Sequence, residues 1–276
     1  PSHFVPLAAP GMVSYGLKTM WNPESPFHIK PRLNADLIDW GMKFIRSASA
    51  EHVEASAPLL RDLHLLSRAE FVALAESLER PFGLVEKGLL MLCREASTLH
   101  EESALAKRAV ELNVPAEVLT PEEAAKLDPG IRMEVAGAVY FPKDAHLSPR
   151  EFVGAVTDEL RSTGVLFLWD AEVRDWRVSG DKVAAAFSRN GESIEGDEFV
   201  IAGGSWSPDV VRPLGLRLPM QAGKGYSLTL RDPRRLPQLC SILTEARVAV
   251  TPMGNTLRVG GTMEIAGLDL SVNPSR

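Results

Sequence analysis

The chain has 276 residues, 45% of them hydrophobic and 24% charged, with a formal net charge of −6. This composition is typical of one large globular domain or two packed lobes, and the intermixed acidic and basic residues argue against a nucleic-acid partner. Only two cysteines occur, Cys93 and Cys240, without CxxC or His spacing, so we expect neither a disulfide framework nor a metal site.

The pattern of apolar residues also bears on where the protein resides. No apolar run approaches the roughly 20 residues that span a bilayer, and the start has no signal-peptide pattern. We therefore expect no transmembrane segment and a reducing, cytoplasmic location. Because the chain begins at Pro1 and stops without an evident final element, we interpret it as an internal piece of a longer protein.

Loops and helices are expected in the first part of the chain. Residues 1–11 hold three prolines and a glycine, which favours an irregular loop. A second loop with Pro23, Pro26 and Pro31 leads to Asn34, a helix N-cap residue.

After this N-cap, apolar residues recur at helical spacing. Leu37, Trp40, Phe44 and Ile45 predict one helix. A longer one is expected over about 58–80, with a buried stripe of six residues: Leu59, Leu63, Leu66, Phe71, Leu74 and Leu78.

The middle of the chain alternates between helix and strand signals. Residues 82–94 predict a hairpin and 98–112 a helix. Thr120 and Ser148 are each followed by proline and a capping-box glutamate, so helices should begin there. Between them, residues 136–142 predict a strand.

Two apolar segments, residues 165–169 and 199–201, are expected to be strands buried on both faces. They flank two alternating runs, 172–178 and 182–188, joined by a turn. This order indicates a nucleotide-binding α/β lobe. Beyond Pro213, four runs are spaced like strands of an antiparallel sheet: 218–230, 241–243, 247–251 and 256–261.

Sequence signatures of catalysis are few. There is no GxGxxG or GxxxxGK fingerprint, so either the chain binds no nucleotide or its fingerprint lies outside this piece. No nucleophile elbow and no paired histidines occur, and no catalytic residue is assigned. His3 and His146 lie in predicted loops, although a structural role is favoured for both.

The glycine turn in FVIAGGSWSP, residues 199–208, allows two interpretations. It is either a tight turn that needs small residues or a strand end on which a ligand's atoms can lie against the backbone.

Four motifs in order decide between them by resemblance: AEV (171–173), FVIAGGSWSP (199–208), LPMQAGKGYSLTL (218–230) and LRVGGTMEIAG (257–267). Together with AAPG (8–11), they resemble the flavin-dependent D-amino acid oxidase superfamily, and within it most the small subunit of bacterial D-amino acid dehydrogenase and its glycine and sarcosine oxidase relatives. The motifs cover most of the chain from Asp144 onward.

The resemblance implies FAD, a mixed α+β and α/β fold, and two lobes. Residues 1–143 are expected to be mainly substrate lobe, 144–212 part of a Rossmann-like FAD-binding lobe, and 213–276 the large antiparallel sheet of the substrate lobe. The resemblance places the glycine-rich fingerprint before Pro1 and the arginine for the substrate carboxylate after Arg276. We therefore expect this piece alone to hold FAD weakly or not at all and to be inactive.

Site residues follow from the same resemblance. Val173, Ala202, Gly203, Gly204 and Trp206 are expected beside the adenosine and pyrophosphate of FAD. Gly260 and Gly261 are expected near the flavin ring, and Tyr226 and Met263 near the substrate.

The implied reaction is oxidation of the CH–NH bond of a D-amino acid, with electrons passing to a quinone or to oxygen, and peripheral contact with the inner membrane is left open. Two alternatives remain: a glycine, sarcosine or hydroxyproline oxidase or dehydrogenase of the same fold, and a non-catalytic binding module.

Overall fold

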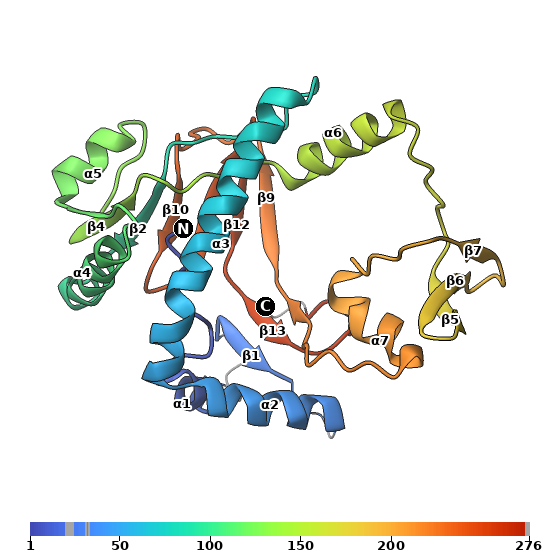
Figure 1. Ribbon diagram of the computed structural model, residues 1–276. Helices are drawn as coiled ribbons and strands as arrows, with labels where there is room; N and C mark the ends of the chain where they lie inside the picture. The colour runs from blue at the N-terminus through green and yellow to red at the C-terminus, as the bar shows by residue number, and fades with distance from the viewer. Residues whose placement is uncertain (20–24, 31, 33, 274–276) are drawn as a thin grey trace.

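The computed structural model describes residues 1–19, 25–30, 32 and 34–273. Figure 1 shows a large sheet with helices around it and a small sheet set apart from it. The helices of the described part are α1 (Met12–Thr19), α2 (Ala35–Ser47), α3 (Ala50–Ser77), α4 (Ala96–Glu111), α5 (Pro121–Leu127), α6 (Pro149–Ser162) and α7 (Ser207–Val211), with short 3-10 turns at Gly204–Trp206 and Arg212–Leu214. None of these helices combines the length and apolarity needed to cross a bilayer.

The large sheet has seven strands in the order β3-β4-β2-β10-β11-β12-β9. All neighbours are antiparallel except β2 and β10, which are parallel, so the sheet is mixed. Its strands are β2 (Leu89–Cys93), β3 (Glu117–Leu119), β4 (Gly137–Phe141), β9 (Ser227–Arg231), β10 (Cys240–Leu243), β11 (Val248–Met253) and β12 (Thr256–Gly260).

Two smaller sheets accompany it. One is β1-β13-β8, formed by Phe27–Ile29, Met263–Ile265 and Gly223–Lys224. The other is β5-β6-β7, formed by Val173–Ser179, Lys182–Ser188 and Ser193–Glu195, which lies beside α7 and away from the large sheet (Figure 1).

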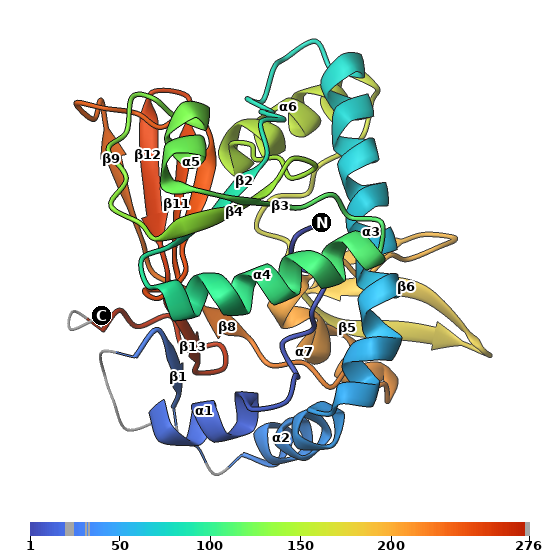
Figure 2. The same cartoon turned by 90° about the vertical axis from the view of Figure 1, so that its left-hand side faces the viewer.

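The core lies on both faces of the large sheet around β2. Consecutive residues of a strand point to opposite faces, and Leu89 and Leu90 accordingly join two different apolar clusters. The cluster around Leu89 includes Ala106 and Ala109 of α4, and the cluster around Leu90 includes Ala124 of α5. Figure 2 shows both helices beside this sheet.

The helix starts predicted after Asn34, Thr120 and Ser148 are confirmed. The side chain of Asn34 accepts hydrogen bonds from the backbone N–H groups of Asp36 and Leu37 at the start of α2. Thr120 forms the expected capping box with Glu123. Ser148 caps α6, and the predicted helix over 98–112 is α4.

Four expectations in the first half need correction. The helix predicted from residue 58 begins at Ala50, with Pro58 inside it, and ends at Ser77. Leu59, Leu63 and Leu66 are exposed rather than buried. Residues 82–94 form no hairpin, because β2 pairs with β4 and β10 instead. β1 lies within the second predicted loop, and α1 follows the first loop, where no element was predicted. Pro23 and Pro31 lie outside the described residues.

The two predicted buried strands at 165–169 and 199–201 are wrong. Both segments are irregular, and Leu166 and Val200 are each 90% exposed. A strand requires a hydrogen-bonded neighbour, and no described strand pairs with either segment. These two apolar segments therefore belong to none of the described sheets.

The later predictions are confirmed except over 218–230, where residues 218–222 are irregular and Gly223–Lys224 is β8 of a different sheet, so only β9 belongs to the large sheet. The alternating runs are β5 and β6 with a turn at residues 180–181, and β9 to β12 form the antiparallel part of the large sheet. The mixed α/β fold class is thus correct, and the division into lobes at residues 143 and 212 stays a proposal.

Candidate functional site

A cavity of about 540 Å³ opens on one face of the large sheet. Four residues opposite one another in the strand register contribute to it: Met91 with Ile242, Ile242 with Ala249, and Ala249 with Gly260. Because paired residues point to the same face, they form a continuous row across β2, β10, β11 and β12. The volume suits a small organic molecule, and Gly260 is one of the predicted site residues.

The walls of this cavity carry more negative than positive charge. Glu101 and Glu102 of α4 and Glu245 after β10 supply three carboxylates, and Arg247 supplies one guanidinium. His3, one of the two loop histidines noted in the sequence, also lines the cavity.

Glu245 fixes the start of α4 against the sheet. Its carboxylate accepts hydrogen bonds from the backbone N–H groups of Arg94 at 2.9 Å and Glu95 at 3.0 Å. Glu95 is the N-cap residue of α4 and Arg94 precedes it, so the carboxylate lies at the N-terminus of the helix, where an anion is favoured. Burial acts to raise the pKa of Glu245, but the Glu95 N–H and the other donors outweigh it and lower the pKa.

Glu102 is in the opposite situation. Burial, followed by repulsion from Glu101 and Glu245, raises the pKa of its carboxyl group. No described residue forms a hydrogen bond or ion pair that stabilises its charge. The ionised form of Glu102 is therefore disfavoured at this position beside the cavity.

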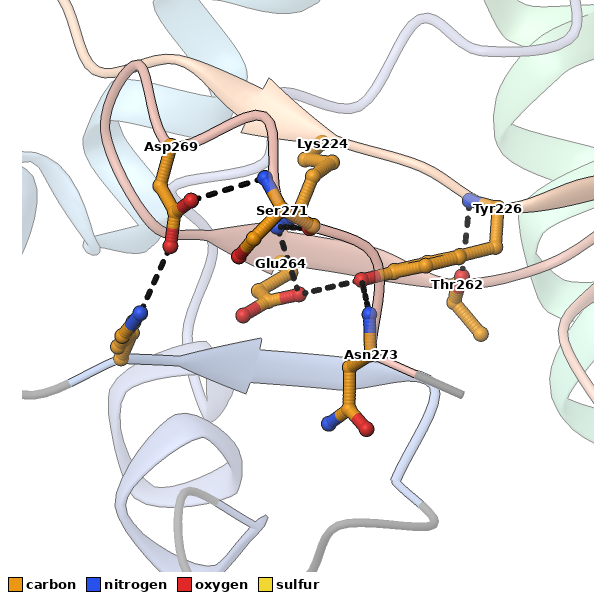
Figure 3. A network of polar contacts seen from close by, with 8 residues as sticks. Lys224, Tyr226, Thr262, Glu264, Asp269, Ser271 and Asn273 are labelled. Atoms are coloured by element: carbon orange, nitrogen blue, oxygen red, sulfur yellow. Dashed lines mark hydrogen bonds and ion pairs between the residues drawn. The ribbon is translucent and has the colours of Figure 1, made fainter. Parts of the chain in front are cut away.

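A network of polar contacts surrounds Tyr226, close in sequence to the end of β12 (Figure 3). We call Tyr226 and its neighbours Lys224, Thr262, Glu264 and Asn273 the Tyr226 group. The Tyr226 backbone N–H donates to Thr262 Oγ1 at 3.1 Å, and its hydroxyl donates to Glu264 Oε2 at 3.2 Å and accepts from the Asn273 N–H at 3.1 Å. Glu264 is only 6% exposed, and Lys224 Nζ lies 3.5 Å from its Oε2. Hydrogen bonds thus hold both the backbone and the hydroxyl of Tyr226.

Met263 lies between these partners on β13. Its backbone N–H donates to the Pro26 carbonyl at 2.7 Å, and it pairs with Phe27 of β1. Its sulfur would lie 3.5 Å from a Cβ placed on Gly223. The backbone of Met263 is therefore held by β1, and its side chain packs against Gly223 of β8.

Gly260, the last residue of β12, and Gly261, which follows it, are close to other parts of the chain itself. A Cβ on Gly261 would lie 2.6 Å from the Arg247 carbonyl oxygen and 2.9 Å from Val248 Cα. A Cβ on Gly260 would lie 3.2 Å from Ser227 Cβ. Both positions thus have a structural reason to be glycine, whatever they contact in a ligand.

The predicted adenosine-side residues lie apart from the Tyr226 group. Val173 begins β5, while Ala202 and Gly203 lead into the 3-10 turn that holds Trp206. Gly204 has φ +53°, and a Cβ there would meet nothing within 4 Å. Its backbone is therefore open to the approach of another molecule, and Trp206 is 53% exposed beside it.

A second cavity, of about 610 Å³, reaches from this turn toward the β8–β13 sheet. Ser205 and Pro208 line one part of it, and Gln221, Ala222 and Gly267 line another. This hollow therefore runs between Ser205, next to the glycine turn, and the segment before Tyr226, but none of the predicted adenosine-side residues lines it: Val173, Ala202, Gly203, Gly204 and Trp206.

Sequence reasoning missed Glu102 and Glu264. Glu264 is flanked by Met263 and Ile265 within a short strand, so a charged residue interrupting an apolar run was the available signal. Glu102 had no such signal, because its neighbours in the cavity come from distant parts of the chain.

Comparison with known proteins gives consistent matches. D-amino acid dehydrogenase of Allorhizobium ampelinum is 27% identical over 276 residues, covering 98% of this chain and 65% of the relative. That of Xylella fastidiosa is 31% identical over 277 residues, covering 98% and 63%. The crystal structure of glycine oxidase from Geobacillus kaustophilus superposes with a TM-score of 0.68 at 27% identity, covering 79% of this chain and 59% of that one.

This chain therefore spans less than two thirds of the length of these relatives. The sequence pattern of the family described as "DAO: FAD dependent oxidoreductase" matches residues 9–276. Because the match includes nearly every residue, the chain belongs to the DAO family of FAD dependent oxidoreductases.

Proposed function

We propose that the protein containing this chain oxidises the CH–NH bond of a D-amino acid to an imino acid, which water then hydrolyses to a 2-oxo acid and ammonia. The cavity above the row from Met91 to Gly260 carries this proposal, because it offers space for an amino acid beside Gly260, one of the residues expected near the flavin ring. The names of the two relatives at 27% and 31% identity support the substrate class.

FAD, when bound, supplies the acceptor for the hydride that leaves the substrate Cα. The glycine turn fits such a cofactor, because the backbone at Gly204 is open where a side chain would otherwise stand. We propose that Ala202, Gly203, Gly204 and Trp206 contact its adenosine and pyrophosphate, with Val173 on the adenine side.

The chain's own contribution is positioning. Tyr226, held by Thr262, Glu264 and Asn273, presents a fixed aromatic ring, and we propose that it borders the substrate together with Met263. Gly260 and Gly261 keep this part of the sheet free of side chains. No side chain of the chain is required as a base if the substrate amine arrives neutral.

A glycine, sarcosine or hydroxyproline oxidase or dehydrogenase is the alternative favoured by the structural match to glycine oxidase. The cavity of about 540 Å³ is larger than glycine needs, which favours an amino acid with a side chain. A non-catalytic binding module is the second alternative.

Several features of the whole protein remain proposals. We also propose that the electron acceptor is a quinone or oxygen and that the location is cytoplasmic, and peripheral contact with the inner membrane stays an open alternative.

The test uses the full-length protein loaded with FAD. It is mixed without oxygen with a panel of D-, L-, N-methyl and cyclic amino acids, while loss of the oxidised flavin absorbance and release of ammonia are followed. We expect D-amino acids to reduce the flavin fastest. Faster reduction by glycine or sarcosine would support the first alternative, and a full-length protein that binds no flavin would support the second.

A further inference from the structure

We propose that Tyr226 contacts the substrate through one face of its ring and not through its hydroxyl, and that Glu264 and Lys224 are positioning residues that fix this orientation. This inference rests on the proposed function, because it takes Tyr226 as a residue that borders the substrate. It adds a division of roles within the Tyr226 group, in which the polar atoms bond to one another and the ring carbons contact the ligand.

The hydroxyl of Tyr226 is already bonded within the chain. It donates its single hydrogen to Glu264 Oε2 at 3.2 Å and accepts from the Asn273 backbone N–H at 3.1 Å. A phenol has one donor, so it could bind a substrate carboxylate only by giving up its bond to Glu264. Glu264 is 6% exposed, and a buried carboxylate that loses a hydrogen bond is destabilised. The hydroxyl is therefore not available to the substrate.

Lys224 covers one face of the same ring. Its Nζ lies 5.8 Å from the ring centroid, in a cation–π contact, and 3.5 Å from Glu264 Oε2. It also donates a hydrogen bond to the Ser271 carbonyl at 2.8 Å (Figure 3). These contacts hold the ammonium group against the ring, so a ligand that stacks on Tyr226 must approach the opposite face.

The two positioning residues lie on paired strands. Glu264 of β13 is the register partner of Lys224 of β8, and opposite charges at such a position attract each other across the sheet. Tyr226 follows Lys224 by two residues. The orientation of its ring is therefore tied to the backbone pairing of β8 with β13 through the bonds to Glu264 and Lys224.

Tyr226 adjoins the cavity above the large sheet. Ser227, the next residue, pairs with Gly260, which lines that cavity. A Cβ on Gly260 would lie 3.3 Å from the Tyr226 carbonyl oxygen, so the two residues are neighbours in space. Tyr226 is only partly buried. It therefore borders a hollow with room for an amino acid.

The first experiment compares two variants of the full-length, FAD-loaded protein that differ only in a hydrogen-bond acceptor. Lys224→Met/Glu264→Gln keeps a side-chain oxygen for the Tyr226 hydroxyl, whereas Lys224→Met/Glu264→Leu does not. Both variants lack the two charges, so neither leaves one buried charge unpaired, and their Tm values show that both fold. We expect kcat to be about tenfold lower in the leucine variant, with a smaller change in KM, because a misplaced group slows the reaction. Equal kcat in the two folded variants would overturn the positioning role.

A double-mutant cycle with Tyr226→Phe tests the hydroxyl. In the parent, its removal should lower kcat about tenfold through the same loss of position. In Lys224→Met/Glu264→Leu this orienting bond is already gone, so Tyr226→Phe should add less than about twofold. Losses that add up, mainly in KM, would show that the hydroxyl donates to the substrate and would overturn the proposal. Tyr140→Phe is the matched control, because it removes a phenol hydroxyl that donates to the Lys87 carbonyl beside β4.

A binding measurement separates this inference from the proposed reaction. Calorimetry uses butyrate, which has a carboxylate but no amine to oxidise. We expect Tyr226→Leu, which removes the ring, to weaken butyrate binding about tenfold more than Tyr226→Phe, as for one aromatic contact. Equal weakening by the two variants, or no binding to the parent, would overturn the proposal. Failure of every D-amino acid to reduce the flavin of the parent would overturn the reaction itself, while the butyrate comparison would still distinguish ring from hydroxyl.

Discussion

Replacing Gly261 by alanine tests whether a glycine is needed there for packing within the protein or for contact with FAD. The new Cβ would lie 2.6 Å from the Arg247 carbonyl oxygen, 2.7 Å from Val248 Cγ2 and 2.9 Å from Val248 Cα. Two of these three atoms belong to the backbone, so the start of β11 must move. Overpacking of this kind costs about 1–3 kcal/mol, and we expect the upper part of that range here.

Thermal unfolding of the full-length protein, with and without added FAD, measures this cost. In a chain of this size, 1 kcal/mol changes Tm by about 2–4 °C, so the flavin-free variant should unfold roughly 4–10 °C lower. Gly41→Ala in α2 is the matched control, because its Cβ would meet nothing within 4 Å and alanine favours a helix by about 0.5–1 kcal/mol.

A different pattern of Tm values would point to contact with FAD. If Gly261→Ala left the flavin-free Tm unchanged but removed the rise in Tm on adding FAD, the glycine would be needed for cofactor contact. The packing explanation would then be wrong.

Four further predictions concern other parts of the chain. Glu264→Gln should destabilise the protein by about 2–4 kcal/mol in denaturant unfolding, because it leaves Lys224 without its buried counter-charge; equal midpoints would contradict this. Thr120→Ala should cost about 1 kcal/mol by the same measurement, since it removes the cap of α5, and Thr120→Ser should restore most of it. Glu102 has a folded pKa raised first by burial and then by Glu101, so its contribution makes stability fall as pH rises from the ordinary carboxyl range through the raised value. Glu102→Gln should therefore be more stable than the parent at neutral pH and equal to it in acid, and a constant difference at all pH values would refute the assignment. Finally, the 276 residues alone should purify without tightly held FAD. Flavin absorbance that co-purifies with them in equimolar amount would contradict this prediction.

Local signals allowed parts of the fold to be predicted. The caps at Asn34, Thr120 and Ser148 specify helix starts through hydrogen bonds within a few residues, so sequence reasoning located them correctly. The alternation in β5 and β6 was informative for the same reason.

Features that depend on distant partners could not be read in this way. Residues 165–169 and 199–201 have the composition of buried strands, yet an apolar run does not reveal whether a pairing strand is present. The stripe of Leu59, Leu63 and Leu66 has correct helical spacing, but spacing does not show which face another element covers. Pro58 suggested a helix start, although α3 continues through it.

The candidate site was predictable only in part, for the same physical reason. The stretch around Met263 was noticed because its motif is local, and Tyr226 because glycines precede it. Glu102 could be connected to Gly260 only after strands from three regions had assembled into one sheet.

The parallel pairing of β1 with β13 has a consequence for the order of folding during synthesis. Phe27 pairs with Met263, and Lys30 Nζ donates a hydrogen bond to the carboxylate of Asp269, 239 residues later in the chain. Until the ribosome has released the segment around Ile265, β1 has no strand to join, and closing so long a loop is entropically costly and slow. The polar group around Tyr226 and Glu264 therefore forms only after residue 265 has left the ribosome. A ribosome stalled shortly before Met263 should carry a nascent chain in which the early strands of the large sheet can pair while residues 27–29 remain open to proteases.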